Sequence, residues 1–259
     1  MRVSLFVTCL ADVFYARGAA DAVRLLRSLG VEVVFPAGQT CCGQPAFNAG
    51  DRPSAGKLAL RTLELLEGDD PVVLPSGSCA AMLRCFYPEL LADGAVEVRE
   101  RVARLSGRVW ELAEFLVRAL GVTELGGGLD GMRVAYHHGC HALRELGVRE
   151  EPLTLLEGSG ALVVPWEAAE ECCGFGGLFS TKLPVVSAAM ADRKLDVLPA
   201  VDVLTSADGG CLLQLGGRLS FRGMAVPVEP LASLLWRARS GGSRASAPPA
   251  AQEGRRGAS

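Results

Sequence analysis

Residues 41–45 read Cys-Cys-Gly-Gln-Pro, and residues 172–177 read Cys-Cys-Gly-Phe-Gly-Gly. Two further pairs of cysteines keep nearly the same interval, and of the nine cysteines only Cys85 has no counterpart. The pairs 131 residues apart are Cys9 and Cys140, Cys41 and Cys172, and Cys42 and Cys173, while Cys79 and Cys211 are 132 residues apart. A recurrence this regular indicates a tandem duplication into two pseudo-symmetric halves.

The segments around the cysteines alternate between strand-like and helix-like patterns. Short apolar runs bounded by turn residues predict buried strands, and apolar residues at helical spacing predict helices. Each half then follows the order strand–helix–strand–helix–strand, which predicts an α/β fold with parallel sheets. The expected strands are 3–7, 31–35, 72–74, 134–136, 161–164 and 201–204, and the expected helices are 21–29, 55–66, 151–158 and 183–195.

The repeat also predicts how the chain is divided. We expect a first cysteine-rich half over 1–104, a helical connection over 105–130, a second cysteine-rich half over 131–236 and a disordered tail over 237–259. The connection is expected to be helical because Val109, Leu112, Leu116 and Leu120 recur at helical spacing. The tail is rich in Ser, Gly, Ala and Pro, a composition that buries too little apolar surface to fold.

Composition excludes several classes of function. The net charge of the 259 residues is −3, so no basic field attracts nucleic acid or anionic lipid. No apolar run approaches the ~18 residues that a membrane span needs. The first residues do not form a secretion signal, so we expect a cytoplasmic protein with reduced thiols. Clustered cysteines in that compartment point to metal binding or redox chemistry.

The cysteines follow the expected strands, where parallel sheets place their sites. Each half offers four thiols, Cys9, Cys41, Cys42 and Cys79 in the first and Cys140, Cys172, Cys173 and Cys211 in the second. Four thiolates suit zinc or an iron–sulfur cluster. The adjacent pair favours the cluster, because structural zinc usually uses Cys-x2–4-Cys spacing, and Gly43 and Gly174 permit a tight backbone beside it. The loop 174–177 lacks the Gly-x-Gly-x-x-Gly spacing, so neither nicotinamide nor flavin is expected there.

All three histidines, His137, His138 and His141, surround Cys140. His138 and His141 are the stronger candidates to ligate metal, to donate to a cluster sulfur or to accept a substrate proton. The alternative is that His137 is a strand side chain and that His141 caps or packs on the next helix. Arg144 could pair with a substrate carboxylate or with a surface acid. Gln44, Asn48 and Asp208 are expected around the site.

Five motifs together resemble the cysteine-rich CCG domain in duplicate, in the short form of the lactate utilisation protein A family. They are Cys-Cys-Gly-Gln-Pro at 41–45, Pro-Ser-Gly-Ser-Cys at 75–79, Cys-His at 140–141, Cys-Cys-Gly-Phe-Gly-Gly at 172–177 and Gly-Cys-Leu at 210–212. The heterodisulfide reductase B subunit and the glycolate oxidase iron–sulfur subunit also carry this domain.

The resemblance implies a cytoplasmic iron–sulfur oxidoreductase subunit, independent of NAD, of a complex that oxidises L-lactate, a small 2-hydroxy acid. It also implies partner subunits, including a larger ferredoxin-like iron–sulfur protein. The full CCG pattern ends in a further cysteine, where this chain has Met82 and Gln214. Four-thiolate [4Fe–4S] clusters need only the cysteines present, and zinc in one half is an open alternative.

Two other functions are compatible with the same cysteines. One is a zinc-stabilised scaffold or interaction protein without redox activity. The other is a heterodisulfide-reductase-type subunit, which would turn over disulfides and against which the missing fifth cysteines count. Cys85, six residues beyond Cys79, is expected to be an ordinary thiol and not a ligand.

Overall fold

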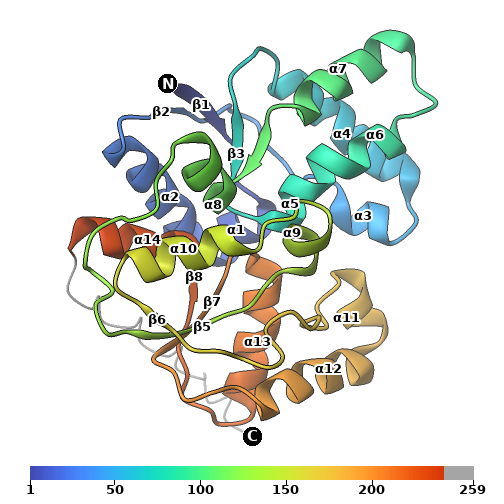
Figure 1. Cartoon of the computed structure of the whole chain (residues 1–259). Helices are drawn as coiled ribbons and strands as arrows, with labels where there is room; N and C mark the ends of the chain where they lie inside the picture. The colour runs from blue at the N-terminus through green and yellow to red at the C-terminus, as the bar shows by residue number, and fades with distance from the viewer. Residues whose placement is uncertain (242–259) are drawn as a thin grey trace, which may run out of the picture.

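The computed structural model describes residues 1–241, which form two four-stranded sheets, one from each half of the chain (Figure 1). The strand orders are β2-β1-β3-β4 and β6-β5-β7-β8, so the second sheet repeats the topology of the first. All strand pairs are parallel. The predicted α/β fold with two pseudo-symmetric halves and parallel sheets is confirmed.

The first half contains all three strands that the sequence predicts, together with a fourth. Val3 of β1 lies opposite Val33 of β2, and Leu5 lies opposite Val73 of β3. The elements are β1 (Arg2–Leu5), α1 (Cys9–Phe14), α2 (Ala16–Ser28), β2 (Glu32–Val34), α3 (Gln44–Asn48), α4 (Arg52–Leu65), β3 (Val72–Leu74), α5 (Gly77–Ala81), the π-helical segment η1 (Met82–Phe86), α6 (Tyr87–Leu90), α7 (Val96–Ser106), β4 (Val109–Glu111), α8 (Leu112–Glu114) and the π-helical segment η2 (Phe115–Ala119).

The second half repeats this order with fewer helices. Val134 of β5 lies opposite Val163 of β6 and Val203 of β7. The elements are β5 (Arg133–Tyr136), α9 (Cys140–Arg144), α10 (Glu150–Gly158), β6 (Leu162–Val163), α11 (Leu178–Lys182), α12 (Pro184–Asp196), β7 (Val203–Ser206), α13 (Gly209–Phe221), β8 (Val228–Pro230) and α14 (Leu231–Ser240).

Two expectations about the ends of the halves need correction. The connection is helical over α8 and η2, as expected, but it also contains β4, which pairs with β3 and completes the first sheet. Its three residues are too few to show an alternating pattern, so the helical spacing of Val109, Leu112 and Leu116 dominated the prediction. The segment expected to be a disordered tail begins inside α14, which runs to Ser240, and the expected tail beyond 241 lies outside the described residues.

The inner strands β3 and β7 are buried on both faces, as is typical of parallel sheets. Side chains of Val3, Leu5, Val134 and Tyr136 point into one apolar cluster between the two halves. The outer face of the first sheet packs against a cluster around α4, α5 and η1, and the outer face of the second packs against a cluster around α12 and α13. The two halves therefore share a continuous core and do not form separate units.

The last helices of each half cross to the other half. The C-terminal helix α14 packs on α2 of the first half, and Figure 1 shows these red and blue helices side by side. The equivalent helix of the first half, α8, packs on α10 of the second. Within residues 1–241 no helix is long and apolar enough to cross a membrane.

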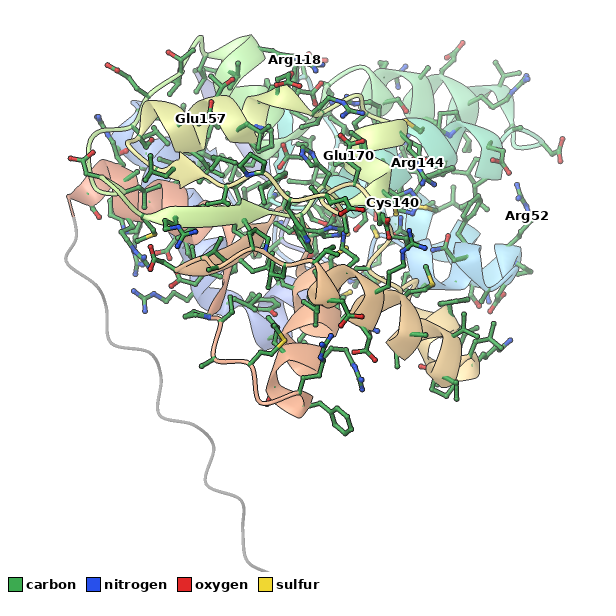
Figure 2. All side chains as sticks on the ribbon, turned by 60° about the horizontal axis from the view of Figure 1, so that its bottom comes forward. Arg52, Arg118, Cys140, Arg144, Glu157 and Glu170 are labelled. Carbon is green, nitrogen blue, oxygen red and sulfur yellow. The ribbon has the colours of Figure 1, made fainter. Side chains whose placement is uncertain are left out.

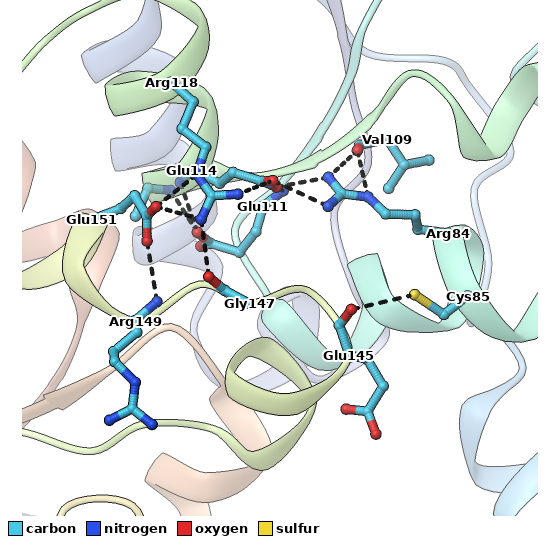
Figure 3. Close-up of polar contacts among 11 residues, drawn as sticks. Arg84, Cys85, Val109, Glu111, Glu114, Arg118, Glu145, Gly147, Arg149 and Glu151 are labelled. Atoms are coloured by element: carbon cyan, nitrogen blue, oxygen red, sulfur yellow. Dashed lines mark hydrogen bonds and ion pairs between the residues drawn. The ribbon is translucent and has the colours of Figure 1, made fainter.

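A chain of ion pairs joins the two halves beside α8 (Figure 3). The buried Glu114 carboxylate lies between Arg84 (2.6 Å) and Arg118 (3.2 Å). The Arg118 guanidinium also donates to Glu151 of the second half over 2.6 Å. The Glu151 carboxylate in turn accepts the backbone N–H of Arg149 over 3.1 Å. These contacts fix α8 and η2 of the first half against α10 of the second.

Candidate metal centre

The cysteines of the first half follow the carboxyl ends of three neighbouring strands. Cys9 begins α1 after β1, the 41–42 pair lies in the loop after β2, and Cys79 lies in α5 after β3. Thr8 and Ser76 cap α1 and α5 with side-chain oxygens that accept backbone N–H groups. These caps fix the turns in which Cys9 and Cys79 lie.

The second half places its cysteines in the same way. Cys140 begins α9 after β5, the 172–173 pair follows β6, and Cys211 lies in the first turn of α13 after β7. The repeat in the sequence is therefore also a repeat in the position of the thiols.

The glycine of each Cys-Cys-Gly stretch has a backbone that other residues rarely adopt. Gly43 has φ 90° and Gly174 has φ 84°. In both turns the glycine N–H donates to the sulfur of the first cysteine, Cys41 or Cys172, over 3.4 Å. A Cβ on Gly174 would lie 2.5 Å from the Ser187 carbonyl oxygen. The expectation that these glycines permit a tight backbone beside the thiols is confirmed.

All eight matched cysteines line one cavity of about 210 Å³ between the two halves. The sulfurs of Cys42 and Cys79 lie 3.3 Å apart, and Gln44, Asn48 and Asp208 also contribute to the lining. The sequence predicts that each set of thiols gathers at the edge of its own sheet. The structure adds that the two edges face each other, so both sets open into the same space.

Hydrogen bonds from neighbouring thiols lower the pKa of the first cysteine of each adjacent pair. A hydrogen bond from Cys42, followed by one from Cys9, lowers the pKa of Cys41 to about 3. A hydrogen bond from Cys140, followed by one from Cys173, lowers the pKa of Cys172 to about 2. The same hydrogen bonds raise the pKa of Cys42 and Cys140 above the usual value. Thiolate is the form of cysteine that binds metal, so each half presents a thiolate ready for a metal.

Asp208 joins the halves at the wall of this cavity. Its carboxylate accepts the Ser76 hydroxyl (3.1 Å) and the Ser78 backbone N–H (2.8 Å), both from the first half. Gly139 leaves room for it, because a Cβ there would lie 2.0 Å from the carboxylate oxygen. The side chain is buried, and the hydrogen bonds satisfy one of its two oxygens.

A family model of the CCG cysteine-rich domain matches the chain twice, at residues 3–84 and 134–216. A protein named lactate utilization protein A from Shouchella clausii (strain KSM-K16) is 44% identical over 238 residues, which cover 91% of this chain and 98% of the relative. The protein of that name from Geobacillus thermodenitrificans (strain NG80-2) is also 44% identical, over the same shares of both chains. The chain belongs to the lactate utilization protein A family.

The segments that match the family model of the CCG domain include both sets of cysteines. The two matched CCG segments contain all eight matched cysteines and end near Met82 and Gln214. Met82 is fully buried in the outer cluster of the first half. The Gln214 amide donates to the Ser187 hydroxyl (2.8 Å), and neither side chain lines the cavity. The two positions that lack the fifth cysteine are therefore packing positions in this family member.

The candidate catalytic residues are only partly brought together. His141 lines the cavity, and its Nδ1 lies 3.2 Å from the Glu145 carboxylate. His138 lies outside the lining, buried edge-on against the Tyr136 ring at 4.8 Å. Arg144 is on the same short helix as Cys140 but is exposed and also outside the lining (Figure 2).

His137 lies beside two thiols of the second half. A ring nitrogen of His137 and the sulfurs of Cys173 and Cys211 all lie within 4.8 Å of one another. Burial, followed by the nearby Lys194 charge, lowers the pKa of His137 to about 3, so the ring is neutral.

Lys194 is a residue near the site that the sequence analysis did not single out. It is fully buried, its ammonium donates to the Ala168 carbonyl, and it lies 4.3 Å from the centre of the Trp166 ring. Burial lowers the pKa of this ammonium to about 8. A comparison of the two halves could have identified it in the sequence. The residue 131 positions earlier is the apolar Leu63, so a lysine at this position is a difference between otherwise repeated segments.

The donor set of this lactate utilization protein A family member fits a metal centre. Eight thiols, four from each half, face one cavity, and soft sulfur donors select zinc or iron–sulfur clusters over hard cations. Cys85 stands apart, since its sulfur lies 3.8 Å from the Glu145 carbonyl oxygen and outside the cavity lining. The residues present therefore suit the binding of a soft metal or an iron–sulfur cluster.

Proposed function

We propose that this chain is an iron–sulfur oxidoreductase subunit of a multi-protein complex that oxidises L-lactate to pyruvate without NAD. The observation that carries the proposal is the single cavity lined by both sets of four thiols. The relatives whose alignments cover 91% of the chain carry the name lactate utilization protein A, which supports lactate as the substrate.

Each half would hold its own [4Fe–4S] cluster through its four matched thiols. Such a cluster accepts and releases one electron at a time, with a potential set by burial and by hydrogen bonds to sulfur. The backbone N–H groups of Gly43, Gly174 and Phe175 lie 3.4–3.5 Å from cysteine sulfurs, where they stabilise negative charge on the thiolates. Because both thiol sets open into one cavity, electrons would pass between the halves over a short path.

Oxidation of lactate to pyruvate releases two electrons and two protons, so the complex needs a proton acceptor. His141 is our candidate, because it lines the cavity. The Glu145 carboxylate orients the ring through Nδ1, which leaves Nε2 to accept the proton. No arginine or lysine lines the cavity among residues 1–241, and the Asp208 carboxylate does. We therefore assign recognition of the lactate carboxylate to a partner subunit, with Arg144 on the exposed surface near Cys140 as this chain's contribution.

The proposed complex works in the cytoplasm and includes a larger ferredoxin-like iron–sulfur protein. None of the nine cysteines, all of them within the described residues, forms a disulfide, which matches a reducing compartment. The net charge of −3 gives no basic surface for nucleic acid.

The test is lactate-dependent reduction of the complex, purified without oxygen and followed by its visible absorbance. We expect L-lactate to reduce the complex that contains the wild-type chain, and to reduce it much less when Cys42→Ala and Cys173→Ala are combined. D-lactate is the matched control for the substrate. A colourless, zinc-loaded protein that L-lactate leaves unchanged would support the zinc scaffold instead. Turnover of a disulfide without lactate would support a heterodisulfide-reductase-type subunit.

A further inference from the structure

We propose that the metal centre of the second half has a histidine ligand, His137 Nε2, beside its cysteines, whereas the centre of the first half is held by thiolates alone. This inference rests on the proposed metal centres and assigns one of them a mixed nitrogen and sulfur donor set.

The hydrogen bonding of His137 leaves one ring nitrogen available. Its Nδ1 lies 3.2 Å from the Ala169 carbonyl oxygen, which can only accept, so Nδ1 carries the proton. Nε2 then has a free lone pair, and within the described chain this buried atom has no hydrogen-bond partner. A histidine that binds a metal commonly donates its other N–H to a backbone carbonyl in this way.

The His137 ring lies beside two thiols of the second half. The ring of His137 is 1% exposed, and one of its nitrogens is within 4.8 Å of the sulfurs of Cys173 and Cys211. A buried, unpaired nitrogen costs stability unless something satisfies it. A metal held by Cys173 and Cys211 would supply that partner.

The first half has no equivalent donor. The residue 131 positions before His137 is Phe6, which is fully buried and has no ligand atom. The nitrogen donor is therefore a feature of the second half alone, although the cysteines are duplicated.

Lys194 positions this histidine and adds a charge of its own. Its ammonium donates to the Ala168 carbonyl, next to the Ala169 carbonyl that orients the His137 ring. Leu63 occupies the equivalent position in the first half. A neutral nitrogen ligand and a nearby buried cation both make a centre easier to reduce than an all-thiolate centre. Electrons are therefore expected to collect on the second-half centre.

The test is pulsed electron paramagnetic resonance of the reduced, iron-loaded protein with ¹⁵N-labelled histidine; a zinc-loaded protein is tested by zinc-edge X-ray absorption. We expect coupling to a histidine nitrogen in the wild-type chain. The coupling should persist in Cys41→Ala/Cys42→Ala, which removes the first-half centre. It should disappear in His137→Phe, which gives the second half the residue type that Phe6 provides in the first. The second-half centre should also have the higher midpoint potential.

The controls keep the inference falsifiable if His137→Phe does not fold. The chain has three histidines, so coupling that survives in a His138→Ala/His141→Ala variant belongs to His137. Metal-loaded wild-type protein without histidine coupling, or coupling lost in the His138→Ala/His141→Ala variant, overturns the ligand assignment and leaves the proposed function standing. Protein that binds no metal overturns both.

Discussion

The Ser76 hydroxyl donates a hydrogen bond to the Asp208 carboxylate over 3.1 Å, and the two residues occupy equivalent positions in the two halves. They are 132 residues apart, as are Cys79 and Cys211. The contact lies where the equivalent turns of the halves meet, and both residues line the thiol cavity. One half supplies the hydroxyl and the other the carboxylate, so the duplicated halves have become complementary at their interface.

Asp208→Ala is expected to weaken the contact between the halves. It removes a buried carboxylate that accepts from Ser76 and Ser78, and hydrogen bonds to charged groups contribute about 1.5–3 kcal/mol each. We expect the free energy of unfolding in urea to fall by about 2 kcal/mol. Asp93→Ala, at an exposed carboxylate, is the control and should change it by less than about 0.5 kcal/mol. Equal losses in the two variants would contradict the role assigned to Asp208.

Arg118→Ala is expected to be more destabilising than Arg52→Ala. Arg118 links the buried Glu114 and Glu151 across the halves, whereas Arg52 and Glu89 form an exposed pair. Exposed pairs contribute about 0–1 kcal/mol, and removing a partner of a buried acid costs more. Thermal denaturation of the two variants makes the comparison, and a lower midpoint for Arg52→Ala would contradict it.

Glu111 is expected to make the protein less stable as pH rises. Burial raises the pKa of this carboxyl from 4.5 to about 8, and one of its oxygens has no partner in the described chain. The unfolded chain releases the proton near pH 4.5 and the folded chain near pH 8. The folded state therefore binds more protons in this interval, and stability falls by up to about 1.4 kcal/mol per pH unit between them.

Glu111→Gln keeps an oxygen for the N–H groups of Ala113 and Glu114 and removes the titration. Urea unfolding between pH 5 and 8 should show a flatter pH dependence for Glu111→Gln than for the wild type. Glu64→Gln, at an exposed position, is the control that should follow the wild type. If Glu111→Gln also followed the wild type, the buried carboxyl would not be the cause.

Gly174→Ala is expected to remove metal from the second half. The residue has φ 84°, and a Cβ would meet the Ser187 carbonyl oxygen, so the turn that holds Cys172 and Cys173 cannot keep its shape. Gly50→Ala is a matched control, because Gly50 has φ 79° but no atom within 4 Å of an added Cβ. It should cost only the left-handed backbone, about 1–2 kcal/mol, with normal metal content. Elemental analysis of both variants decides, and full metal content in Gly174→Ala would count against the prediction.

The parts of the fold that follow local patterns could be predicted from the sequence. The apolar runs around Val3, Val72 and Val134 predicted three strands in each half, and all of them are present. The fourth strands, β4 and β8, were missed because three residues carry too little pattern and β8 ends in a proline. Only pairing within the folded sheet makes these segments strands.

The thiol sets could be predicted, but their common cavity could not. The interval of 131 residues identified the cysteines because duplicated sequence leaves a repeat. The meeting of the two sets depends on how one sheet packs on the other, through Asp208 and the crossing helices, and no local pattern encodes that packing. For the same reason the sequence favoured His138 and His141 over His137, whereas the structure places His141 in the cavity lining, leaves His138 out of it and places His137 beside Cys173.

The most direct test of the central claim is metal and acid-labile sulfide per chain, in protein purified without oxygen. The wild type should hold iron matched by sulfide, at about four to eight iron atoms per chain for one or two clusters. Cys172→Ala/Cys173→Ala should lose the share of the second half and Cys41→Ala/Cys42→Ala that of the first, while Cys85→Ala keeps the full amount. Unchanged metal in both double variants, or no metal in the wild type, would contradict the account.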